Sequence, residues 1–125
     1  MKHSHFYLRL FFWLLTILWM SFIFYLSARS TVGIGQTEVS RFVILKFFHL
    51  VEYFVLFILI RLSSGSAKTA LILTYLYAVS DELHQVFVPG REGKWLDTLI
   101  DLLGMLIGLL FFRLVLTRFR FLRSL

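Results

Sequence analysis

Acidic, basic and imidazole side chains gather in three otherwise apolar segments of this chain, where charged groups are costly. Imidazole groups exchange protons near neutral pH, and carboxyl groups also serve as general acids and bases. Guanidinium and ammonium groups bind phosphate oxygens. The side chains suited to such chemistry are Lys46, His49, Glu52, Tyr53, Asp81, Glu82, His84, Gln85, Arg91, Asp97 and Asp101. These residue types predict acid–base chemistry beside a phosphate-containing group.

The chain is too apolar to be a small water-soluble domain. Of its 125 residues 59% are hydrophobic and 16% are charged, and the mean hydropathy is +0.84. A small soluble domain leaves much of its surface in water and needs more polar side chains. The composition therefore argues against a soluble enzyme, a nucleic-acid-binding module and a disordered segment, and it predicts an integral membrane protein. The absence of cysteine excludes disulfides and thiolate chemistry.

Four apolar stretches predict an all-α fold, in which residues 1–125 form a single domain with four transmembrane helices. The spans are expected at roughly 9–28, 43–61, 69–88 and 97–117, since about 20 helical residues cross the hydrocarbon core of a bilayer. The first stretch is expected to be an uncleaved span, because its apolar part is long for a signal peptide. The polar segments between the stretches are expected to be loops and turns.

Basic residues are unequally distributed between the two sides of such a bundle. Eight of the 13 Lys and Arg side chains fall on the side of the termini, and five fall on the other side. Because the cytoplasmic segments of membrane proteins carry the excess of basic residues, both termini are expected in the cytoplasm and loops 29–43 and 89–95 outside. At the C-terminal end, Arg118, Arg120 and Arg123 suit contact with anionic lipid.

The three polar clusters should meet at one end of the bundle. They occupy the first half of the second span, the last half of the third span and the start of the fourth, and antiparallel spans bring these parts to one leaflet. Residues three or four apart share a helix face. This spacing predicts three shared faces: Lys46, His49 and Tyr53; Asp81, His84 and Gln85; Asp97 and Asp101. A polar cavity at head-group depth in the outer leaflet is the predicted result.

Taken singly, each polar residue also has a structural interpretation. Asp97 suits the start of a helix, and His49 suits a hydrogen-bonded core position. Gly104 and Gly108 permit close helix packing. The joint placement of acid, base and amide groups on three spans is what favours a functional cavity over separate structural roles.

The polar segments resemble the signature of VanZ-like membrane proteins. The resemblance rests on residues 80–91, with the string DE-x-HQ-x-FVPGR, and on Lys46, His49, Glu52 and Tyr53 upstream; Asp97, Asp101, Gly104 and Gly108 follow. It implies a small four-helix membrane protein in the bacterial cytoplasmic membrane, with a link to the cell envelope and to glycopeptide (teicoplanin) resistance. It also implies an expected function as a membrane-embedded enzyme that modifies lipids with phosphate-containing head groups.

Under the enzyme hypothesis, several residues compete for each role. Arg91 and Lys46 would bind a lipid phosphate. His84 would act as the general acid/base or the nucleophile, oriented by Asp81 or Asp101. The other candidates are Glu82 or Glu52 as a second acid or base, His49 as the proton donor to a leaving oxygen, and Tyr53, Gln85 and Asp97 as binding groups.

A second hypothesis is a non-catalytic membrane protein that binds lipid or antibiotic, or serves transport or assembly. Membrane lipids are the expected partners under either hypothesis, nucleic acid is not, and the sequence leaves the oligomeric state open. No cofactor is predicted. A divalent metal held by His49, His84 and carboxylates is the less favoured interpretation, because no short metal-ligand motif supports it.

Overall fold

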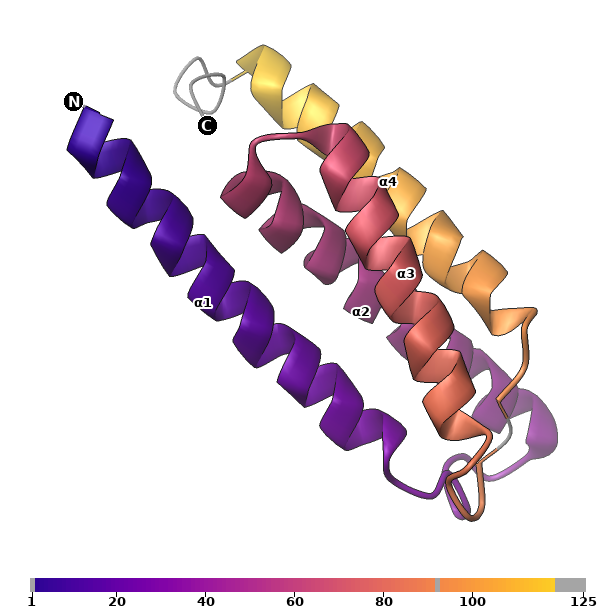
Figure 1. Ribbon diagram of the computed structural model, residues 1–125. Helices are drawn as coiled ribbons and strands as arrows, with labels where there is room; N and C mark the ends of the chain where they lie inside the picture. The colour runs from indigo at the N-terminus through magenta and orange to yellow at the C-terminus, as the bar shows by residue number, and fades with distance from the viewer. Residues whose placement is uncertain (1, 92, 119–125) are drawn as a thin grey trace.

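The computed structural model describes residues 2–91 and 93–118, which form four α-helices. They are α1 (Lys2–Ser27), α2 (Glu38–Ser64), α3 (Ala67–Gln85) and α4 (Asp97–Arg118), and these residues contain no strand. In Figure 1 the start of α1, the α2–α3 turn and the end of α4 lie at one end of the bundle, and the other two loops lie together at the opposite end. The all-α expectation is confirmed.

Three of these helices are long and apolar enough to cross a membrane. The candidate stretches are His5–Ser27, Glu38–Ser64 and Asp97–Val115, with mean hydropathies of 2.0, 2.3 and 2.1. The third helix is not among them, because Lys68, Asp81 and Glu82 fall within its 19 residues. Three of the four helices therefore support the interpretation that this chain is a membrane protein.

Local capping explains where α2 begins and ends. The Thr37 hydroxyl accepts a hydrogen bond from the Ser40 amide at 3.1 Å, and the Ser40 hydroxyl accepts one from the Thr37 amide at 2.9 Å. This reciprocal cap satisfies free amides at the helix start. The helix thus begins at Glu38 rather than near 43, and the expected loop 29–43 is shorter. It ends at Ser64, and the capping residue Gly65 has a φ of 74°, a left-handed conformation that glycine adopts at no steric cost.

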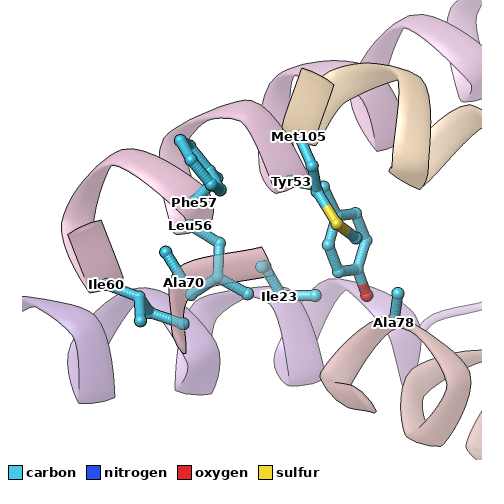
Figure 2. Close-up of a cluster of buried hydrophobic side chains, with 8 residues drawn as sticks. All are labelled: Ile23, Tyr53, Leu56, Phe57, Ile60, Ala70, Ala78 and Met105. Carbon is cyan, nitrogen blue, oxygen red and sulfur yellow. The ribbon is translucent and has the colours of Figure 1, made fainter. Parts of the chain in front are cut away.

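The second helix forms the centre of the bundle, because its contacts with α1, α3 and α4 are the most extensive ones between helices. Its buried apolar side chains provide half of the core; α3 adds two residues, and α1 and α4 add one each. Figure 2 shows this cluster, which consists of Ile23, Tyr53, Leu56, Phe57, Ile60, Ala70, Ala78 and Met105. In that view the Tyr53 hydroxyl points toward α3 beside Ala78. The Tyr53 hydroxyl therefore lies at the border between the apolar core and the polar side chains at one end of the bundle.

Two glycines allow α4 to lie directly against α2. A Cβ atom at Gly104 would stand 2.5 Å from the carbonyl oxygen of Leu50, and one at Gly108 would stand 2.9 Å from the Phe57 ring. Any side chain at Gly104 would therefore push the helices apart. This close approach sets the distance between the polar residues that the two helices carry.

The apolar composition of the first helix suggests that its tryptophans face lipid. In the structure both tryptophan side chains are partly buried. Trp13 and Trp19 both pack against the core, and the Trp19 indole donates a hydrogen bond to the Glu52 carbonyl at 3.0 Å. The surface of α1 is instead covered by other apolar side chains, such as Phe11, which is 53% exposed. The indole needs a hydrogen-bond acceptor, and the inward position supplies one.

Candidate functional site

A histidine and two carboxylates from three helices meet at the polar end of the bundle. His49 of α2 lies with its Nδ1 atom 2.9 Å from Oδ1 of Asp101 on α4 and 3.7 Å from Oε1 of Glu82 on α3. The side chains are buried, with exposures of 4% for His49, 0% for Asp101 and 6% for Glu82. We call these three residues the His49 cluster.

A second polar group lies beside this cluster. Asp81 accepts hydrogen bonds at one oxygen from the Tyr53 hydroxyl at 3.1 Å and from the Gln85 amide at 2.9 Å. The same Gln85 nitrogen donates to the Ser27 hydroxyl of α1 at 3.2 Å. The network thus joins α1, α2 and α3, and all four side chains are buried.

Several oxygens of the two groups lack a hydrogen-bond partner among residues 2–91 and 93–118. They are Oδ2 of Asp101, Oε1 of Glu82 and Oδ1 of Asp81, and each is inaccessible. Buried polar atoms are normally paired, and an unpaired one is destabilising. In the His49 cluster, one ligand-type atom from each residue lies within 4.8 Å of the others, so this set could also hold a metal ion.

An ion pair between Lys46 and Asp97 lies at the margin of the cluster. The two side chains are 19% and 9% exposed, and they join α2 to the first turn of α4. The Lys46 amine also lies 5.3 Å from the centre of the Phe42 ring. The pair is therefore partly exposed, and both side chains line a polar cavity.

Arg91 ties the loop after α3 to the end of α1. Its guanidinium donates to the Leu26 carbonyl at 3.0 Å, to the Arg29 carbonyl at 3.4 Å and to the Gln85 side-chain oxygen at 3.0 Å. A further hydrogen bond runs from the Thr31 amide to the Gly90 carbonyl at 3.3 Å. The arginine is therefore both a positive charge at the site and a link that fixes the two loops.

Two cavities open beside these residues. The polar cavity has a volume of about 160 Å³, and its basic lining residues are Arg41, Lys46, Arg91 and Lys94. The apolar cavity has a volume of about 310 Å³ and is lined by side chains that include Leu26, Ile34, Phe48 and Glu52. His49, Thr31, Leu45 and Arg91 line both, so the two cavities are neighbours that share a wall.

The structure does not bring His84 into the His49 cluster. Its ring stacks on Phe24 of α1, with 4.4 Å between ring centres and 16° between planes. Its buried Nδ1 atom has no hydrogen-bond partner within the described part of the chain. His84 thus lies against α1, whereas the Asp81 carboxylate bonds to Tyr53 of α2. The catalytic role expected for His84 beside Asp81 and Gln85 stays a prediction.

Two residues of the site are absent from the set predicted from sequence. Arg41 donates to the Thr31 hydroxyl at 2.9 Å and lines the polar cavity, and Ser27 accepts the bond from Gln85. The capping pair Thr37 and Ser40 was the available signal for Arg41, because an earlier helix start places 41 on the face of 38, 45 and 49. Of the expected C-terminal anchor, Arg120 and Arg123 lie outside the described residues.

Removing Lys46 tests how much the ion pair stabilises the bundle. We expect Lys46→Met to lower the free energy of unfolding by about 1–3 kcal/mol, because it leaves the Asp97 carboxylate without its cation. Thermal unfolding in detergent measures the loss. Asp97→Asn added to Lys46→Met should restore part of it, and strictly additive losses in this double-mutant cycle would contradict the pairing.

Comparison with known proteins places the chain in a family of membrane proteins. Residues 12–116 match the family model described as VanZ/LLP1, which covers most of the chain. No curated protein and no solved structure matches the chain. The matched region contains the His49 cluster, the Lys46–Asp97 pair and Arg91.

Proposed function

Because this chain belongs to the VanZ-like family of membrane proteins, we propose that it is an enzyme of the bacterial cytoplasmic membrane that modifies the phosphate-containing head group of a lipid. The reaction class is hydrolysis or transfer at the lipid phosphate. The proposed role in the cell is in the envelope, where altered lipid head groups change the response to glycopeptides.

One observation carries the proposal: a buried histidine–carboxylate pair borders a small cavity rich in basic groups. His49 and Asp101 are 2.9 Å apart, and His49 lines the same cavity as Arg41, Lys46 and Arg91. Basic groups around a confined polar space suit a phosphate. An oriented imidazole beside that space suits proton transfer to or from the reacting oxygen.

The geometry favours His49 over His84 as the acid or base. With Nδ1 held by the Asp101 carboxylate, the ring orientation is set and Nε2 is the nitrogen left for proton transfer. Glu82, with an oxygen 3.7 Å from Nδ1, is the nearby second acid or base. Arg91 supports the site twice, through its charge and through the loop contacts that shape the cavity.

The neighbouring apolar cavity suggests how a lipid substrate would lie. Its walls carry Leu26, Ile34, Leu45 and Phe48, while the polar cavity carries the basic side chains. A lipid with an acyl or isoprenoid part next to a phosphate matches this arrangement. Its apolar part would lie in the apolar cavity and its phosphate in the polar cavity. The shared wall at His49 would then lie near the junction of the two parts, where the bond to be broken is found.

Profiling of membrane lipids in cells tests this function. Cells expressing the wild-type chain should contain a head-group product that is absent with Asp101→Asn, because the amide cannot hold the His49 imidazolium as a carboxylate does. Ser80→Ala, an exposed change on α3, is the matched control and should make the product. Unchanged lipids at equal membrane levels of all three proteins would favour the non-catalytic binder.

The proposal includes the topology in which α3 is a fourth span and both termini are cytoplasmic. Antiparallel packing of four helices supports it, because the two loops that shape the cavities lie at one end of the bundle (Figure 1). The excess of basic residues on the other end favours the cytoplasm for that end. The cavities would then face the outer leaflet.

Cysteine labelling tests this orientation directly, since the chain contains no cysteine. An impermeant maleimide added to intact cells should label Val32→Cys in the α1–α2 loop and not Lys68→Cys near the α2–α3 turn. Both native side chains are exposed, so lack of labelling does not reflect burial. Labelling of Lys68→Cys alone would place the cavities on the cytoplasmic side.

A further inference from the structure

We propose that the His49 cluster is a binding site for one divalent transition-metal ion, with His49, Glu82 and Asp101 as its protein ligands. The site goes beyond the proposed lipid chemistry and does not depend on it. Three helices supply the ligands, so the ion would also join α2, α3 and α4 at their polar ends.

The positions of the three side chains suit a shared ion. Their ligand-type atoms lie within 4.8 Å of one another, and the two measured separations from His49 Nδ1 are 2.9 Å to Asp101 and 3.7 Å to Glu82. Ligands about 2.0–2.2 Å from a tetrahedral zinc ion lie somewhat over 3 Å apart. Small side-chain movements therefore suffice to place all three atoms around one ion.

Two buried carboxylate oxygens without a hydrogen-bond partner give an independent reason to propose a bound ion. Oδ2 of Asp101 and Oε1 of Glu82 have no hydrogen-bond partner in the described part of the chain. Both side chains are more than nine-tenths buried. Such atoms are normally bonded to protein, water or an ion. An ion between them would give the Glu82 oxygen a partner directly, and Asp101 can offer either oxygen.

The charges of the cluster also call for a cation. Asp101 and Glu82 share His49 as their ion-pair partner, and the nearby Lys46 is engaged by Asp97. One imidazolium can balance only one of the two carboxylates. A divalent ion with a neutral imidazole balances both, which lowers the cost of burying two negative groups.

The donor set indicates the class of ion. One imidazole nitrogen with two carboxylate oxygens suits zinc, manganese or iron(II), whereas calcium and magnesium prefer oxygen ligands alone. Three protein ligands leave a coordination position open, and His49 lines both cavities, from which water or an anion can arrive. In the metal-loaded protein His49 is a ligand, and in the metal-free protein it is the acid or base proposed above.

Zinc binding by the purified protein tests the site. The chain is produced without a histidine tag, stripped with chelator in detergent and dialysed against a series of free Zn²⁺ concentrations. Bound zinc is then counted by mass spectrometry at each concentration. All proteins tested carry His3→Ala and His5→Ala, which remove the two histidines near the N-terminus. The chain with only these two changes is the background protein. We expect one zinc per chain, and we expect Asp101→Asn and Glu82→Gln to weaken binding by more than the about 100-fold that loss of a supporting outer residue can cost.

Asp81→Asn is the matched control, since it makes the same change at a neighbouring buried aspartate outside the cluster. It should weaken zinc binding less than Asp101→Asn and Glu82→Gln do, because Asp81 is not a ligand. If a variant does not fold, the visible spectrum of Co²⁺ in the background protein decides, because ligand-field bands of a four-coordinate site appear only when cobalt is bound there.

The proposal is overturned if the folded background protein binds no zinc and shows no such cobalt bands, or if Asp101→Asn binds zinc as tightly as its parent. The first result would show that the cluster does not hold these metals, and the second would place the bound zinc elsewhere in the chain. A zinc site without any lipid product would contradict the proposed function alone. A lipid product that needs Asp101, made by a folded protein that binds no zinc when zinc is supplied, would contradict the metal site alone.

Discussion

The His49→Gln variant should process its lipid about 100- to 10,000-fold more slowly than the wild-type protein, which is the usual contribution of a positioned acid or base. Glutamine approximates the size of the imidazole and can still hydrogen-bond to Asp101, but it cannot exchange a proton near neutral pH. The measurement is the rate of product formation by protein reconstituted into vesicles made from the lipid extract in which the product was found.

His84→Gln distinguishes the structural interpretation from the one based on the sequence motif. The structure places His84 against Phe24 and away from the His49 cluster, so its loss should change the rate by less than about tenfold, well below the effect of losing an acid or base. A rate as low as that of His49→Gln would return the catalytic role to His84. Equal, unchanged rates in both variants would remove histidine acid–base chemistry from the proposal.

The Gly104→Val variant should lower the free energy of unfolding by more than about 3 kcal/mol, the upper end of ordinary overpacking. The first added atom would already stand 2.5 Å from the Leu50 carbonyl oxygen, which belongs to backbone and cannot rotate away. The helices α2 and α4 must then separate, and His49 must move from Asp101. Thermal unfolding in detergent and the lipid assay measure both consequences.

Leu106→Val is the control for this change, because it alters an exposed residue of the same helix. Valine there should change the free energy of unfolding by less than about 0.5 kcal/mol, as is usual for surface positions. A Gly104→Val protein as stable as this control, with normal activity, would show that α4 does not need its close approach to α2.

Much of the architecture followed from composition and periodicity. Long apolar stretches predicted an all-helical membrane protein, and the helices and the family match confirm this. Spacings of three and four residues placed Lys46, His49 and Tyr53 on one face of α2, and the three now contact Asp97, Asp101 and Asp81 respectively. The pattern within a helix is visible in sequence because the helical repeat is constant.

The partners across helices were decided by tertiary structure. No local rule states that Glu82, on the other flank of α3, reaches His49 while His84 turns to Phe24. The start of α2 at Glu38 likewise brought Arg41 to the cavity, although its segment was expected to be a loop.

The sequence by itself determined the membrane class, the number of helices and the residue types available at the polar end of the bundle. Tertiary structure decided which of these side chains meet. Packing against its neighbours sets how each helix is rotated about its axis and how far it is shifted along that axis. The contact of Gly104 with Leu50 sets the α2–α4 distance, and the hydrogen bonds of Arg91 to Leu26 and Arg29 set the loops. These contacts join residues far apart in the chain, and no helical period relates them.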